Sequence, residues 1–218
     1  EVVSSGGLRW TPDLFEAFRA RYGYDLRDQL PALHEEVGDW KRVRHDYFAL
    51  LNDMFVDRWA KPWSRYCDEK GISWTGHYWE HSWPNVTGVI DNMSMAAWQQ
   101  TPGIDMLFNQ FNEKDVHAQF GNIRSVKEVR SIANQLGRQR VLSETYGGAG
   151  WEATFKDMKR LADWQMGLGG NLVNQHVGHM SLDGVRKFDY PPMFTRAASW
   201  WENYHVLNDY IARICTVM

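Results

Sequence analysis

The 218-residue sequence predicts an α/β fold in which helices connect the strands of a parallel sheet. Short apolar segments alternate with amphipathic helical segments along most of the chain, which is the pattern of strand–helix–strand units. Polar residues that can carry out chemistry come directly after the apolar segments. Parallel sheets place their functional groups at the carboxyl ends of the strands, so this second observation supports the same fold class. We treat residues 1–218 as a single domain, or as a fragment of one.

The first third of the chain is predicted to be helical. Thr11 can cap a helix, Pro12 suits its first turn, and Gly23 is a typical terminator. A long helix is expected over residues 40–69, where apolar residues recur at helical spacing. Pro62 should kink or divide this helix, because proline lacks the N–H that a helix interior requires.

The remainder of the chain alternates between strands and helices. The strands are expected at residues 72–79, 104–108, 140–144 and 171–177. The helices are expected at residues 92–100, 125–137, 151–168 and 198–217, and the Ser125–Glu128 pair reads as a capping box. Helices between successive strands give the right-handed crossovers of a parallel sheet.

These elements favour a (β/α)8 barrel of the TIM-barrel type over a doubly wound sheet. The sequence has neither a Gly-x-Gly-x-x-Gly segment nor a Walker A segment, which removes the usual support for a nucleotide site. A complete barrel needs about 250 residues, and only four strands are readable. We therefore expect the later half of a barrel, which does not close by itself. The absence of an initiator methionine and the helical character of the last residues suggest a piece of a longer polypeptide.

Composition narrows the possible partners. The chain has 24 basic and 27 acidic residues and no basic run, so nucleic acid is not an expected partner. No apolar stretch reaches 18 residues, so no membrane span is expected. Cys67 and Cys215 could form one bridge, but we interpret them as free thiols.

Aromatic residues are unusually frequent. Twelve Trp, nine Tyr and ten Phe make up 14% of the chain. Aromatic faces can stack on the C–H faces of sugar rings, whereas the ordinary role of an aromatic side chain is to fill a core. Several of these residues stand beside acidic and histidine-rich segments, which favours a carbohydrate as the substrate.

Glu144 is the strongest candidate for a catalytic residue. The apolar strand at residues 140–144 delivers this carboxylate into a glycine-rich loop that also contains Tyr146. Cleavage of an acetal needs a carboxylate on a rigid support and a second carboxyl group in a different protonation state. The alternative is a strand-end glutamate that caps the next helix or pairs with an arginine.

A second candidate cluster follows the first expected strand. Glu80 lies among His77, Trp79 and His81, a composition typical of a sugar subsite. A metal site is a competing interpretation, because two histidines flank a carboxylate. On an extended strand, however, His77 and His81 share one face while Glu80 points to the other. A solvated loop is the structural alternative.

Further polar residues follow the other expected strands. Asp105 lies in the second strand, and His176 and His179 follow the last strand. Each is a candidate for binding sugar hydroxyls. The two histidines could equally orient a carboxylate, or could be polar residues with purely structural partners.

Three segments of the sequence stand out together. They are the Trp-Thr-Pro-Asp segment of residues 10–26, with 30–33 after it, the Leu-Ser-Glu-Thr-Tyr-Gly segment of 142–147 and the Asn-Gln-His segment of 174–176. With these segments the sequence resembles glycoside hydrolase family 106, the α-L-rhamnosidases and their relatives. The resemblance implies a barrel catalytic domain within a larger multidomain polypeptide, and a periplasmic or secreted location. It also implies inverting hydrolysis by two glutamates and the option of a bound calcium ion, although the sequence itself requires no cofactor.

The resemblance also assigns positions in the site. Glu1 would stand at the end of the fourth barrel strand, Glu80 at the fifth and Glu144 at the seventh. Glu144 would then be the general base, and either Glu1 or Glu80 the general acid. The first three strands of a barrel are missing from this sequence, so part of any active site is not readable. The alternatives are a retaining, β-galactosidase-like enzyme with Glu144 as nucleophile, and a non-catalytic carbohydrate-binding barrel fragment.

Overall fold

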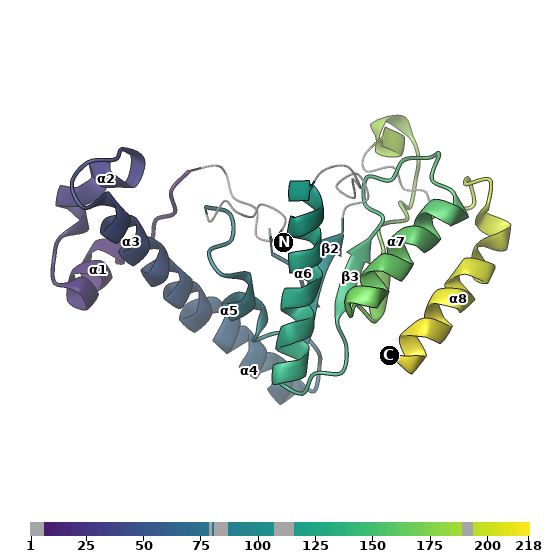
Figure 1. The fold of residues 1–218 in the computed structure, drawn as a ribbon, viewed down its shortest axis with the longest axis horizontal. Helices are drawn as coiled ribbons and strands as arrows, with labels where there is room; N and C mark the ends of the chain where they lie inside the picture. Colours follow the sequence, from purple (N-terminus) through teal and green to yellow (C-terminus); the bar gives the residue numbers. More distant parts are fainter. Residues whose placement is uncertain (1–6, 79, 81–86, 107–115, 189–193) are drawn as a thin grey trace.

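The computed structural model describes residues 7–78, 80, 87–106, 116–188 and 194–218, and for residues 116–121 it describes the backbone alone. A helical part formed by the first third of the chain extends to one side of a sheet that is flanked by the later helices (Figure 1). This arrangement confirms the α/β class that the sequence predicts. No helix among the described residues is long and apolar enough to cross a membrane.

The helical part has its own apolar core. Leu14, Phe18, Leu26, Val43 and Tyr47 are buried against one another within it. Its elements are α1 (Leu14–Tyr22), a 3-10 turn (Leu26–Gln29), α2 (Leu30–His34), α3 (Trp40–Phe55), a π-helical turn (Val56–Ala60) and α4 (Lys61–Lys70).

Both proline and glycine act in this part as the sequence predicts. Gly23 ends α1 in the left-handed conformation, with φ of 79°. The long helix is divided just before Pro62, where the backbone widens into the π-helical turn and the N–H of Lys61 bonds to the carbonyl of Val56. The missing N–H of Pro62 explains why regular α-helical bonding does not run through this point.

The sheet is parallel throughout, in the order β1-β2-β3-β4. Its strands are β1 (Thr75–Gly76), β2 (Thr101–Met106), β3 (Leu142–Thr145) and β4 (Leu172–Gln175). The helices associated with it are α5 (Asn92–Ala96), α6 (Val116–Gln135), α7 (Phe155–Leu168) and α8 (Tyr204–Val217), with 3-10 turns at Gly184–Phe188 and Trp201–Asn203. The four expected strands and their parallel pairing are confirmed. Their membership of an eight-stranded barrel stays a prediction.

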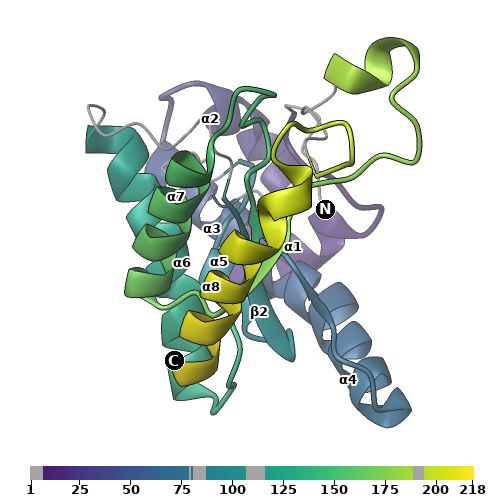
Figure 2. The same cartoon turned by 90° about the vertical axis from the view of Figure 1, so that its right-hand side faces the viewer.

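The two faces of the sheet differ in what covers them. One face packs on α6, α7 and α8 through a core that contains Ile104, Val129, Met158, Leu161 and Ile211 (Figure 2). On the opposite face Leu172 is 39% exposed, although it lies within a strand of the sheet. An exposed apolar residue in this position is expected if further parts of a longer polypeptide pack there.

Several predicted boundaries are wrong. Within residues 72–78 of the first predicted strand only Thr75–Gly76 form a strand, and residue 79 lies outside the described residues. Gly76 has a φ of 153°, which is not the backbone conformation of a regular strand, so the strand ends there. Ser125 does not begin a helix, since α6 starts upstream at Val116 and Ser125 is buried within it. The capping box belongs instead to Thr154 and Asp157 at the start of α7.

The other boundaries shift by a few residues. The predicted helices at 92–100 and 198–217 are shorter at one end, at Asn92–Ala96 and Tyr204–Val217. The strand predicted at 104–108 is Thr101–Met106, and residues 107 and 108 lie outside the described residues. Cys67 and Cys215 are both free thiols, as expected.

Close approach of β1 and β2 predicts a strict requirement for glycine at position 103. A Cβ atom there would lie 2.6 Å from the backbone oxygen of Gly76, which cannot move without breaking the pairing of the two strands. Gly103→Ala should therefore destabilise the protein by about 1–3 kcal/mol in urea unfolding followed by tryptophan fluorescence.

Gly167→Ala is the matched control, because nothing lies within 4 Å of its added Cβ in α7. This variant should be as stable as the parent or up to about 1 kcal/mol more stable. Equal unfolding free energies for the two variants would contradict the close strand contact.

Candidate active site

Parallel register brings polar side chains into one row at the carboxyl end of the sheet. Asp105 of β2 is the register partner of Glu144 in β3, and Glu144 is the register partner of Asn174 in β4. Thr145, the next residue of β3, points the other way, toward α7, where its hydroxyl accepts a hydrogen bond from Gln165 at 3.1 Å. Alternation along the strand therefore directs Glu144 to the face opposite the helices.

His77 contacts Glu144 directly. The Nε2 atom of His77 lies 3.1 Å from the Oε2 atom of Glu144. The other ring nitrogen, Nδ1, lies 3.2 Å from the backbone carbonyl oxygen of Tyr78 and 4.0 Å from the Oε2 atom of Glu80. Both ring nitrogens thus face acceptors, and an imidazole can satisfy two acceptors only when both nitrogens carry a proton. The geometry indicates a doubly protonated, positively charged His77.

The charges around His77 agree with this protonation state. Burial by itself lowers the pKa of His77. The hydrogen bond with Glu144, the charge that Glu80 carries once it has ionised, and the charge of Asp105 together raise the pKa of His77 to about 9. In turn, the hydrogen bond from His77 holds the pKa of Glu144 below its ordinary value, against the opposing effect of burial. At neutral pH, Glu144 is therefore an ionised carboxylate beside a buried cation.

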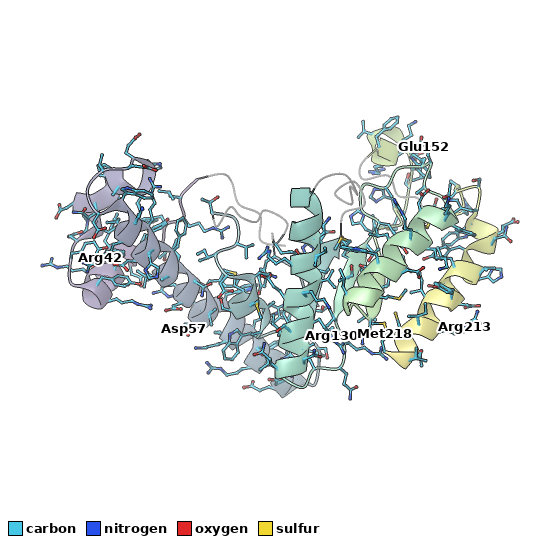
Figure 3. The ribbon with its side chains drawn as sticks, in the orientation of Figure 1. Arg42, Asp57, Arg130, Glu152, Arg213 and Met218 are labelled. Carbon is cyan, nitrogen blue, oxygen red and sulfur yellow. The ribbon has the colours of Figure 1, made fainter. Side chains whose placement is uncertain are left out.

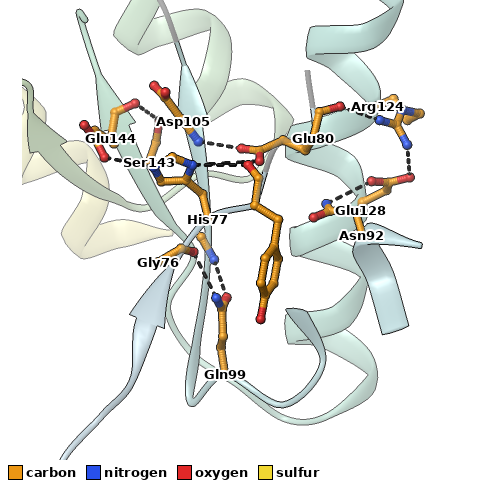
Figure 4. Close-up of polar contacts among 12 residues, drawn as sticks. Gly76, His77, Glu80, Asn92, Gln99, Asp105, Arg124, Glu128, Ser143 and Glu144 are labelled. Carbon is orange, nitrogen blue, oxygen red and sulfur yellow. Dashed lines mark hydrogen bonds and ion pairs between the residues drawn. The ribbon is translucent and has the colours of Figure 1, made fainter. Parts of the chain in front are cut away.

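Glu80 lies on the other side of the His77 ring (Figure 4). Its side chain has no exposed surface, and its Oε1 atom accepts a 2.6 Å hydrogen bond from the backbone N–H of Asp105. Burial raises the pKa of Glu80 to about 8, with His77 acting in the opposite direction. Glu80 is thus a mainly protonated carboxyl group at neutral pH, enclosed behind His77.

A polar network holds the backbone of Glu80 in place. The carbonyl oxygen of Glu80 accepts a 2.8 Å hydrogen bond from Arg124 of α6. Arg124 also donates to Glu128 at 2.7 Å, and Glu128 accepts from Asn92 at 3.1 Å (Figure 4). This network ties the segment after β1 to helices α5 and α6.

Gln99 bridges the backbones of β1 and β2 next to the site. Its Nε2 atom donates to the carbonyl oxygen of Gly76 at 3.1 Å, and its Oε1 atom accepts from the N–H of Gly103 at 3.1 Å (Figure 4). Sequence reasoning missed Gln99 and Arg124, because neither stands in a motif and their importance comes from contacts with distant parts of the chain.

Of the remaining expected site residues, His176 lies at the site, His179 lies further along the chain, and three are outside the described residues. His176 follows β4, and its Nε2 atom lies 3.6 Å from the Oε1 atom of Glu144, so it joins the site. His179 is half-buried further along, and its Nε2 atom has no hydrogen-bond partner in the part of the chain that the structure describes. Glu1, Trp79 and His81 lie outside the described residues.

Tyr146 takes a structural position rather than the sugar-binding one expected from the sequence. It is 1% exposed, and its hydroxyl donates to the backbone carbonyl of Met158 at 3.0 Å. Its backbone adopts a φ of 78°, a conformation that side-chain-bearing residues adopt only when their surroundings impose it. Tyr146 anchors the loop after Glu144 in the core and is not available to a sugar in this structure.

No group of three or more His, Cys, Asp or Glu residues in the described part of the chain is arranged to hold a metal ion. The Oε1 atom of Glu80 faces the N–H of Asp105, and the Oε2 atom of Glu144 faces the ring of His77. A bound calcium ion stays an implication of the family resemblance.

Comparison with known proteins points to one family. The model of the family described as alpha-L-rhamnosidase matches residues 2–218. The solved structure of a rhamnosidase from Novosphingobium sp. PP1Y is similar, with a TM-score of 0.71 and 26% sequence identity over 95% of this chain. The match covers 20% of that rhamnosidase, so this chain spans about a fifth of its length. No curated protein matches the chain.

The raised pKa of His77 predicts a pH dependence of stability. The pKa is about 9 in the folded protein and 6.5 ordinarily, so the charged form contributes stability that is fully present below pH 6.5 and is lost as the pH rises through 9. His77→Gln should remove this contribution. The difference in unfolding free energy between the parent and the variant should then shrink by on the order of 3 kcal/mol from pH 6 to pH 10.

Chemical denaturation at a series of pH values measures this difference. His205→Gln is the matched histidine-to-glutamine control, because His205 is exposed on α8 and bonds only to the backbone of Glu202 among the described residues. Its unfolding free energy should stay close to that of the parent. A pH-independent gap between the parent and His77→Gln would contradict a charged His77.

Proposed function

The chain belongs to glycoside hydrolase family 106, the α-L-rhamnosidase family, and from this premise we propose that it forms part of the catalytic domain of an enzyme that hydrolyses terminal α-L-rhamnosides. One observation carries the proposal: Glu144 is a partly exposed carboxylate at a strand end, held ionised by a buried cation. A group with these properties can accept a proton from water.

In the proposed reaction Glu144 is the general base. Its carboxylate accepts a proton from a water molecule as the water oxygen forms a bond to the anomeric carbon. The bond between that carbon and the glycosidic oxygen breaks at the same time, and a second carboxyl group protonates the departing oxygen. The products are free rhamnose with inverted configuration and the alcohol of the leaving group.

Two residues compete for the role of general acid. Glu80 has a suitable protonation state, because burial raises its pKa to about 8, yet its side chain has no exposed surface. Glu1 is the position that the family resemblance favours, and it lies outside the described residues. An inverting enzyme holds its two carboxyl groups about 6.5–9.5 Å apart, which leaves room for the attacking water.

The sugar is proposed to bind on the open face of the sheet. Asp105 and Asn174 flank Glu144 in the strand register, and His176 approaches it from beyond β4. Carboxylate, amide and imidazole groups can all hydrogen-bond to sugar hydroxyls. The remainder of a longer polypeptide is proposed to complete the site, as the length of the similar rhamnosidase suggests.

Substitution of the base tests the proposal. Glu144→Gln keeps the shape of the side chain but cannot accept a proton, so kcat on an aryl α-L-rhamnoside should fall by about 10²- to 10⁴-fold in the full-length protein. Glu152→Gln is the control, because Glu152 is an exposed glutamate in the loop that follows the same strand (Figure 3). Full activity in Glu144→Gln would overturn the assignment. Binding without hydrolysis by the parent would indicate a non-catalytic carbohydrate-binding protein.

The configuration of the product tests the mechanism separately. Proton NMR during the first turnovers should show β-L-rhamnose appearing before mutarotation, since the water attacks from the face opposite the leaving group. If α-L-rhamnose appears first, the enzyme retains configuration. Glu144 would then be the nucleophile of a β-galactosidase-like mechanism rather than the base.

A further inference from the structure

We propose that His77 and Glu80 are positioning residues for Glu144: His77 holds the base by direct contact, and Glu80 fixes His77 and the end of β2 instead of donating the catalytic proton. This inference rests on the proposed function of Glu144. In this proposal His77 positions Glu144 and does not bind the sugar, although the sequence predicts sugar binding. Of the two candidates for the general acid, Glu1 and Glu80, the proposal favours Glu1.

The hydrogen-bonding capacity of His77 is used within the protein. One N–H points to Glu144 at 3.1 Å and the other to the backbone carbonyl of Tyr78 at 3.2 Å. The His77 side chain is 10% exposed, compared with 26% for Glu144. A residue that binds a sugar hydroxyl needs a free donor or acceptor on the substrate side, and His77 has none left after these two contacts.

Glu80 is directed into the protein rather than toward the substrate. Its Oε1 atom accepts the N–H of Asp105 at 2.6 Å, and its Oε2 atom lies 4.0 Å from the Nδ1 atom of His77. The ring of His77 stands between Glu80 and Glu144 (Figure 4). A general acid must contact the glycosidic oxygen, but Glu80 has no exposed surface for that contact.

The contacts of Glu80 and His77 link the ends of three strands. Glu80 joins the segment after β1 to Asp105 in β2, and His77 joins the same segment to Glu144 in β3. Among the described residues, the other ionisable groups that act on His77 or Glu144 are Glu80, Asp105 and His176. Loss of the His77 cation should therefore let the Glu144 side chain move and should raise the pKa of Glu144. A displacement of about 1 Å can lower the rate roughly 100-fold.

A series of leaving groups separates the two roles of Glu80. Glu80→Gln keeps the acceptor for Asp105 but has no acidic proton. We expect a similar fold-loss in kcat/KM for aryl and alkyl α-L-rhamnosides, because positioning affects every substrate equally. If Glu80 is the acid, the loss in kcat/KM will instead be small for p-nitrophenyl rhamnoside and will grow by orders of magnitude as the leaving group becomes more basic. The alkaline limb of the pH profile of the variant will also disappear. That result would overturn the inference.

Asp46→Asn provides the control for this substitution. Asp46 is a buried acidic residue, as Glu80 is, but it lies in α3 and accepts a hydrogen bond from Tyr24 at 3.0 Å. The amide change should affect stability there without changing kcat/KM. Thermal unfolding of all variants identifies any loss of activity that comes from a smaller folded fraction.

Two substitutions of His77 test its contact with the base. His77→Leu removes both donors and the charge, so kcat should fall roughly 100-fold while KM changes little. The acid limb of kcat/KM should move to higher pH, because the cation no longer lowers the pKa of Glu144. His77→Gln restores a donor without a charge and should recover part of kcat but not the position of the acid limb. A rise in KM alone, with an unchanged acid limb, would identify His77 as a sugar ligand and overturn the inference.

The protonation state of His77 can be measured without substrate, and therefore independently of the proposed function. Nitrogen-15 NMR of the histidine-labelled full-length protein at pH 7.5, with His77→Gln for assignment, should show His77 with both ring nitrogens protonated. A neutral His77 would overturn the inference even in an active enzyme. A doubly protonated His77 in a protein that hydrolyses no rhamnoside would instead refute the proposed function while the contact with Glu144 stands.

Discussion

The parallel pairing of β2, β3 and β4 is the constraint on which the candidate site depends. Because these strands run in the same direction and in register, Asp105, Glu144 and Asn174 stand side by side at one end of the sheet. The alternate residues of β2 and β3, among them Ile104 and Thr145, point to the helical face and are buried. A shift of one residue in β3 would exchange the two sets, placing the carboxylate in the core and removing it from the site. The apolar packing of the helical face thus fixes the position of Glu144.

Electrostatics then determines what Glu144 can do. An exposed carboxyl group without charged neighbours would have an ordinary pKa, and burial would raise that pKa. The imidazolium of His77 reverses that effect and keeps Glu144 ionised. The cation in turn is tolerated in a mostly buried position because acceptors face both of its ring nitrogens. Burial raises the pKa of Glu80 behind the ring, whereas the hydrogen bond from His77 lowers the pKa of Glu144 in front of it, so one fold favours different protonation states for two glutamates.

Local sequence patterns were sufficient to predict the four strands, their parallel arrangement and the position of Glu144. They succeed because apolar runs and helical periodicity report burial directly. The position of Glu80 could not be predicted in this way. An extended strand through residues 72–79 would direct His77 and Glu80 to opposite faces, but the strand ends at Gly76 and the two side chains turn toward each other. Tyr146 is a predicted site residue because of its place beside Glu144, whereas its hydroxyl bonds to Met158 in the core. Both differences arise from tertiary contacts with residues distant in the sequence.

The role of Glu144 is tested most directly by a crystal structure of the full-length Glu144→Gln protein with an intact α-L-rhamnoside. We expect the anomeric carbon to lie over the carboxyl end of β3, with a water molecule between it and the side chain at position 144. We also expect His77 to contact that side chain and not the sugar. A rhamnoside bound away from the end of β3, or one whose glycosidic oxygen is contacted by Glu80, would contradict the roles proposed for Glu144 and Glu80.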